Sequence, residues 1–129
     1  MAQARRSDRS DAVAFGLRGE ALAAWCLRLK GYRVLARRSK HHVGEIDLIA
    51  RRGSILAFVE VKARVDAGAA IEAITHNQRR RIERAAQAYM ARTAAVAACQ
   101  PRFDVVLVAG RGFGGFWPRH IADAWRPEA

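Results

Sequence analysis

The sequence predicts an α/β domain in which helices flank a mixed central sheet, with the elements in the order αβββαβ. Two segments, residues 15–30 and 76–97, carry apolar side chains at helical spacing. Runs rich in β-branched residues predict four strands, over residues 33–37, 45–51, 55–63 and 103–109. A chain of 129 residues that is 51% hydrophobic is long and apolar enough to bury one core.

The first predicted helix is expected to be largely buried, because it is apolar on two sides. Gly31 follows this helix and is well placed to end it. Glu20 lies on a stripe otherwise built from Ala and Leu, which is an unusual place for a carboxylate. We interpret the polar and basic residues 1–14 as a flexible arm, and residues 15–129 as a single domain.

The connections between the strands predict the topology of the sheet. Arg52-Gly53 is a short turn between the second and third strands, and it predicts an antiparallel hairpin. The third and fourth strands are joined through the second helix, so this crossover should be parallel and right-handed. Residues 117–122 are typical of an edge strand.

The second helix has clear signals at its start. A loop over residues 64–73 leads to Thr75 and Gln78, which have the spacing of a capping box. Pro101 is expected to break the chain after this helix, before the fourth strand. In that strand Asp104 lies among apolar residues, and we interpret it as structural and paired with an arginine.

The net charge is the most informative property of the composition. Lys and Arg number 23 and Asp and Glu 12, which leaves a formal charge of +11. Such a small basic domain is expected to bind a polyanion, nucleic acid first, although a compositional bias toward Arg would raise the charge without any function. The candidate phosphate contacts are Arg37, Arg38, Lys40, Arg64, Arg79 and Arg80.

Several other classes of protein are disfavoured. No apolar run approaches the ~18 residues that a membrane helix requires, so no membrane partner is expected. No apolar segment follows the basic N-terminus, so no secretory signal is visible. Cys26 and Cys99 are expected to be reduced and buried, which fits the cytoplasm. No Cys/His spacing of a metal site occurs.

Acidic residues on two neighbouring strands point to chemistry. Glu60 and Lys62 share one face of the third strand, since side chains alternate with a period of two. Asp47, on the second strand, can meet Glu60 across the hairpin if the register allows. Oxygen ligands of this kind suit Mg²⁺ or Mn²⁺, which can orient water at a phosphodiester. The alternative is a set of ion pairs on a solvated face, with Asp47 bound to an arginine.

This arrangement resembles the PD-(D/E)XK nuclease superfamily. More closely, the chain resembles the YraN family of predicted endonuclease-like bacterial proteins. The combination of Gly44-Glu45-Ile46-Asp47-Leu48-Ile49 with Phe58-Val59-Glu60-Val61-Lys62 is specific. The other matching stretches are Gly19-Glu20-x-x-Ala23, Gly31-Tyr32 and Arg102-Phe103-Asp104-Val105-Val106, so that the resemblance covers residues 16–109.

The resemblance implies a restriction-endonuclease-like core, similar to Holliday-junction resolvases. It implies that Asp47 and Glu60 are metal ligands, that Lys62 acts on the attacking water or the transition state, and that Glu20 is an auxiliary acid and a further ligand. DNA is then a more probable partner than RNA, and a homodimer is expected by analogy.

One position departs from the family. Where the family often has a lysine near the start of the second helix, this chain has Gln78, which a capping-box role would explain without catalysis. Two functions therefore stay open: a metal-dependent endonuclease, and a non-catalytic nucleic-acid-binding protein that has kept the fold. The carboxylate cluster favours the first, and Gln78 the second.

Overall fold

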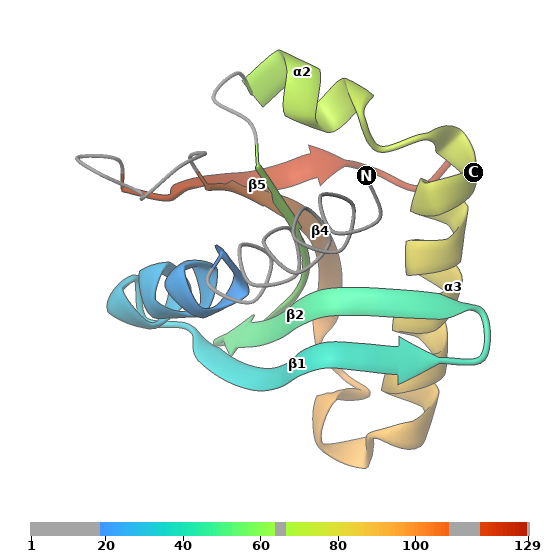
Figure 1. Cartoon of the computed structure of the whole chain (residues 1–129). Coiled ribbons are helices and arrows are strands. Elements are labelled where there is room, and N and C mark those ends of the chain that lie inside the picture. Colours follow the sequence, from blue (N-terminus) through green and yellow to red (C-terminus); the bar gives the residue numbers. More distant parts are fainter. Residues whose placement is uncertain (1–18, 64–66, 109–116, 129) are drawn as a thin grey trace, which may run out of the picture.

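One five-stranded sheet runs through the protein, with its strands side by side in chain order (Figure 1). The structure, a computed structural model, describes residues 19–63, 67–108 and 117–128. The strands are β1 (Arg33–His41), β2 (Gly44–Arg52), β3 (Ile55–Lys62), β4 (Gln100–Leu107) and β5 (Arg119–Trp125). The helices are residues 19–29, α2 (Ala67–Glu72) and α3 (His76–Arg92), followed by the 3₁₀ turn η1 (Ala94–Val96).

The topology confirms the predicted α/β fold with a mixed sheet and the αβββαβ order. β1, β2 and β3 form an antiparallel meander, and β3 pairs in parallel with β4. β5 pairs antiparallel with β4 and closes the far edge of the sheet. The crossover from β3 to β4 contains α3, as the chain order predicts, together with the short helix α2.

Hydrophobic clusters cover both faces of the sheet. Ala57 and Phe58 are neighbours on β3 yet belong to different clusters, because successive strand side chains point to opposite faces. The first helix packs on the Ala57 side through Ala23, Ala24 and Leu27. α3 packs on the Phe58 side through Ile82, Ala85 and Ala86. In Figure 1 the first helix (blue) and α3 (yellow) accordingly lie on opposite faces.

Several predicted boundaries were wrong. β1 continues to His41 instead of ending at residue 37, because the polar second half of this edge strand pairs with β2 up to Gly44. α3 ends at Arg92 instead of residue 97, because the chain turns at Thr93 and places Val96 in the core. The loop predicted over residues 64–73 contains α2, whose small residues carry little helical periodicity.

The fourth strand begins earlier than predicted, at Gln100, and it includes Pro101. The Gln100 N–H donates to the Ser54 carbonyl. Successive backbone N atoms of a strand point to opposite edges, so the N of Pro101 faces the edge of β4 that pairs with β5. β5 pairs with β4 only from Phe103 on, and a proline that lacks its N–H is therefore tolerated at position 101. The edge strand predicted over residues 117–122 is β5.

Other expectations can be compared with the described residues. Cys26 and Cys99 are buried free thiols, as predicted. Among the described residues, no helix has the length and apolarity needed to cross a membrane. The predicted arm, residues 1–14, and Arg64 lie outside the described residues.

Candidate active site

Asp47 and Glu60 stand opposite each other where β2 and β3 stop pairing. The ladder between these strands ends at the pair Leu48 and Val59, so the next position on each strand is Asp47 and Glu60. At that point the Val61 backbone N–H donates to Asp47 Oδ2 at 2.9 Å. The Asp47 carboxylate therefore takes the place of a ladder hydrogen bond, which fixes its position.

The backbone of β2 is irregular at Asp47. Ile46 belongs to the cluster on the α3 side and Leu48 to the cluster on the side of the first helix, so alternation fails across the residue between them. β1 is irregular at the same level. Arg38 stands opposite Asp47 and has φ 52°, the left-handed region that is unfavourable for a residue with a side chain.

Arg38 holds the acidic residues of the site together. Its Nε lies 3.2 Å from Glu20 Oε2 and 4.0 Å from Glu45 Oε1. Glu20 comes from the first helix and is buried, and its Oε1 has no hydrogen-bond partner within the described part of the chain. Burial, and then the Asp47 charge, raise the pKa of Glu20, while Arg38 opposes both.

The electrostatics of the strand residues match this crowding. Burial, and then the Asp47 carboxylate, raise the pKa of Glu60 to about 8. Burial also raises the pKa of Asp47, although the Val61 N–H and Lys62 lower it. Since Lys62 lowers the pKa of both carboxyl groups, its ammonium belongs to the same cluster. Glu60 is therefore largely protonated at neutral pH.

The predicted catalytic residues come from three elements: Glu20 from the first helix, Asp47 from β2, and Glu60 and Lys62 from β3. The Asp47 charge raises the pKa of Glu20 and of Glu60, and Lys62 lowers the pKa of Asp47 and of Glu60, so the four residues form one charged group. Arg38 was predicted only as a phosphate contact, and its place among the carboxylates was missed. A positive φ leaves no signal in the hydrophobic pattern, so the sequence alone offers no means of finding it.

The oxygen donors of the site fit a hydrated divalent cation better than a closed cage. The described residues contain no group of three or more His, Cys, Asp or Glu arranged to hold a metal. Mg²⁺ usually needs only one or two protein carboxylates, because it keeps several waters. Asp47 and Glu60 supply that number, and a bound cation would favour the ionised forms that burial disfavours in both groups. Glu20 Oε2 is paired with Arg38, so Glu20 belongs to the surroundings of such an ion.

The candidate phosphate contacts divide into two groups. Arg37 and Lys40 are exposed on β1, on either side of Arg38. Arg79 donates from Nη2 to the Ile71 carbonyl at 3.1 Å, so its guanidinium is held against the protein. Arg80 is exposed on α3. Arg37 and Lys40 thus flank, along β1, the arginine that pairs with Glu20.

Asp104 is structural, as predicted, and it has more partners than predicted. The side chain is fully buried and accepts two hydrogen bonds from Arg102, at 2.9 and 2.7 Å. His120 Nε2 and the Asp123 backbone N–H on β5 lie 2.7 and 2.9 Å from its oxygens. Burial alone would raise the pKa of Asp104, but these hydrogen bonds outweigh it and lower the pKa to about 2. The residue anchors β5 to β4.

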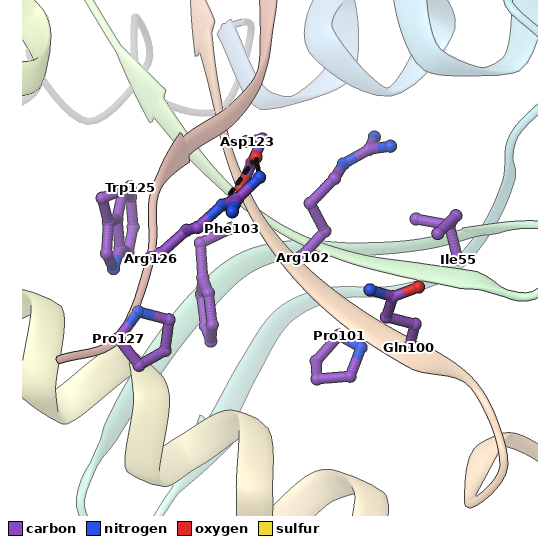
Figure 2. A pocket seen from close by; sticks show the side chains of 9 residues that line it. All are labelled: Ile55, Gln100, Pro101, Arg102, Phe103, Asp123, Trp125, Arg126 and Pro127. Atoms are coloured by element: carbon purple, nitrogen blue, oxygen red, sulfur yellow. Dashed lines mark hydrogen bonds and ion pairs between the residues drawn. The ribbon is translucent and has the colours of Figure 1, made fainter. Parts of the chain in front are cut away.

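The hollow drawn in Figure 2 lies at the other end of the sheet. It has a volume of about 330 Å³ and is lined by residues at the start of β4 and the end of β5, among them Gln100, Arg102 and Trp125. Gln100 pairs with Ile55, whereas Lys62 pairs with Leu107 at the opposite ends of the same strands. Its one carboxylate, Asp123, is bound to Arg126. The hollow is therefore separate from the carboxylate cluster.

Comparison with known proteins bears on the whole chain. The model of the uncharacterised protein family UPF0102 matches residues 19–108. A UPF0102 protein of Parvibaculum lavamentivorans is 56% identical over 116 residues, which cover 90% of this chain and 84% of the relative. Another, of Mesorhizobium japonicum, is 48% identical over 125 residues, or 97% of each chain. These matches confirm the resemblance inferred from the motifs, and the names carry no activity.

Proposed function

We propose that this chain, which belongs to the uncharacterised protein family UPF0102, is a metal-dependent endonuclease that hydrolyses phosphodiester bonds in DNA. One observation carries the proposal. Two partly buried carboxyl groups on adjacent strands, Asp47 and Glu60, share one site with Lys62, and burial and charge raise both of their pKa values. Such a cluster costs stability unless something binds it, and perturbed groups of this kind concentrate at functional sites.

Each residue has a defined task in this proposal. Asp47, fixed by the Val61 N–H, and Glu60 would hold Mg²⁺ or Mn²⁺, which when bound supplies a polarised water and a positive charge near the phosphate. Lys62 supplies an ammonium beside the carboxylates, where it can stabilise negative charge that develops in the transition state. Glu20 is held by Arg38 and acts as an auxiliary acid.

The proposal is tested by cleavage of labelled linear, flapped and four-way DNA with Mg²⁺ or Mn²⁺. We expect product that disappears with a chelator and with Lys62→Ala, while the DNA affinity of this variant stays within a few-fold of wild type. Lys40→Ala removes the same charge from an exposed position of β1 and should still cut. Glu20→Gln should slow cleavage less than Asp47→Ala. Cleavage that resists the chelator, or that Lys62→Ala retains, would place the chemistry elsewhere.

A second candidate function is nucleic-acid binding without catalysis, and Gln78 favours it. The Gln78 side chain accepts from the Thr75 N–H at 2.9 Å and Thr75 Oγ1 accepts from the Gln78 N–H at 3.2 Å, so both residues cap α3. Gln78 therefore does not supply the charge of the lysine frequent in the resembling family. Tight, salt-sensitive DNA binding with no product under any metal would support this second function.

A further inference from the structure

The surface of the first helix exposes two large aromatic or aliphatic side chains, and the chain before β5 exposes a third. Trp25, Leu29 and Trp117 have 58%, 71% and 57% of their surface exposed. Indole rings are normally well buried in a small domain, because they offer the largest apolar area to a core. Two that are more than half exposed therefore call for a partner.

Contacts at Cys26 bring the two tryptophans into one region. The Cys26 thiol lies 3.7 Å from the Pro118 carbonyl, and the Trp117 side chain interacts with the same thiol. Cys26 directly follows Trp25 on the helix, so Trp117 lies near the helical turn that carries Trp25. We call Trp25 and Trp117 the tryptophan surface. The third tryptophan of the chain, Trp125, is buried, so exposed indole rings occur at this surface and not at every tryptophan.

Basic residues lie next to both tryptophans in the described part of the chain. From residue 21 to residue 44 the sequence contains six basic residues and no acidic one. The Arg28 guanidinium lies over the Trp25 ring, 5.4 Å from its centroid. Arg119 is exposed two residues after Trp117. A second copy of the chain docked on the same patch would bring like charges together, whereas a polyanion would be attracted.

We propose that the tryptophan surface binds unpaired nucleotides by stacking their bases on Trp25 and Trp117 while Arg28 and Arg119 contact the phosphates. Exposed aromatic rings next to cations are how proteins bind single strands, whose bases have free faces. Paired bases lie inside a duplex and cannot use such rings. The proposal deepens the proposed function, since it rests on nucleic acid as the partner and identifies the substrate as DNA with a single-stranded part.

Tryptophan fluorescence tests the proposal without metal or cleavage. Oligodeoxythymidylate, which lacks secondary structure, should quench the wild-type emission, and a blunt duplex of equal length should quench it much less. Trp25→Ala and Trp117→Ala should each weaken the affinity for oligodeoxythymidylate by about 5- to 140-fold, the range for loss of one stacked base. Each should bind the duplex within two-fold of wild type. Trp25→Phe should keep most of the affinity, since it keeps an aromatic face.

Two results would overturn the proposal. One is equal loss of duplex and single-strand affinity in the alanine variants, which would indicate a general role in folding or charge. The other is a dimer that dissociates in the double variant during sedimentation while its single-strand affinity is unchanged, which would make the surface a contact between copies. Failure of the proposed function is distinguishable, because an absence of metal-dependent cleavage leaves the metal-free quenching unaffected.

Discussion

At the scale of single residues, Glu60 makes stability depend on pH. Its pKa is about 8 in the folded protein, against an ordinary value of 4.5. At a pH between these two values, the folded state holds a proton on Glu60 that the unfolded state has lost, so the free energy of unfolding falls as the pH rises through that window. The stability that Glu60 contributes by holding this proton is fully present below pH 4.5 and is gone above pH 8.

The first prediction concerns Glu60→Gln, which keeps the shape and removes the titration. In metal-free thermal melts from pH 5 to pH 9, we expect the melting temperature of the variant to rise relative to that of the wild type as the pH rises. Glu72→Gln, at an exposed position of α2, serves as the matched control and should follow the wild type. If the melting temperatures of Glu60→Gln and wild type change in parallel with pH, burial does not disfavour the ionised form of Glu60.

Asp47 carries the second prediction. Asp47→Asn removes one charge but keeps an oxygen that can accept the Val61 N–H, so the fold should be preserved. At pH 8.5, where Glu60 is ionised, the metal-free variant should melt at a higher temperature than wild type, because repulsion between the carboxylates is gone.

Added metal extends the same test. Mg²⁺ or Mn²⁺ should raise the melting temperature of the wild type by mass action and that of Asp47→Asn much less. If Asp47 were instead a structural partner of Arg38, its loss would lower the melting temperature. A lower melting point combined with no metal response in the wild type would falsify the metal site.

At the scale of elements, the strands show what a sequence can and cannot predict. The hairpin of β2 and β3 follows from its turn, but its register, which brings Asp47 and Glu60 together just beyond the pair Leu48 and Val59, was left open by the sequence. The second half of β1 could not be predicted, because its polar residues lack the alternation of a half-buried strand. α2 and the end of α3 were missed for a related reason, since Ala-rich segments fit helix and turn alike.

The irregular backbone of β1 carries the third prediction. Both Arg38→Gly and Arg38→Ala remove the ion pair with Glu20, so they differ only at the backbone. Glycine adopts φ 52° without cost, whereas alanine does not, and Arg38→Gly should be more stable by about 1 kcal/mol. Urea unfolding of the two variants measures this difference. An alanine variant of equal or greater stability would show that β1 relaxes at this position.

At the scale of the whole molecule, a net charge of +11 accompanies a small acidic cluster. Positive potential attracts the DNA backbone from any direction, while the carboxylates repel it locally unless a cation is bound. Under the proposed function, affinity and cleavage are expected to be separable properties, because the arginines and lysines would determine the first and the carboxylate cluster would determine the second. Composition alone predicts the affinity for a polyanion, whereas the candidate carboxylate site required the register of two strands.

The last prediction follows from this separation. The logarithm of DNA affinity should fall linearly with the logarithm of salt concentration, with a slope steeper than about −3, since each phosphate contact releases a counterion. Arg37→Ala and Lys40→Ala should each reduce the slope by about 1. Arg126→Ala is the matched control: its guanidinium is already paired with Asp123, so the slope should not change. Asp47→Asn should also keep the slope while it abolishes cleavage. If affinity is insensitive to salt, or if Arg126→Ala lowers the slope as much as Arg37→Ala, the exposed cations of β1 are not the DNA contacts.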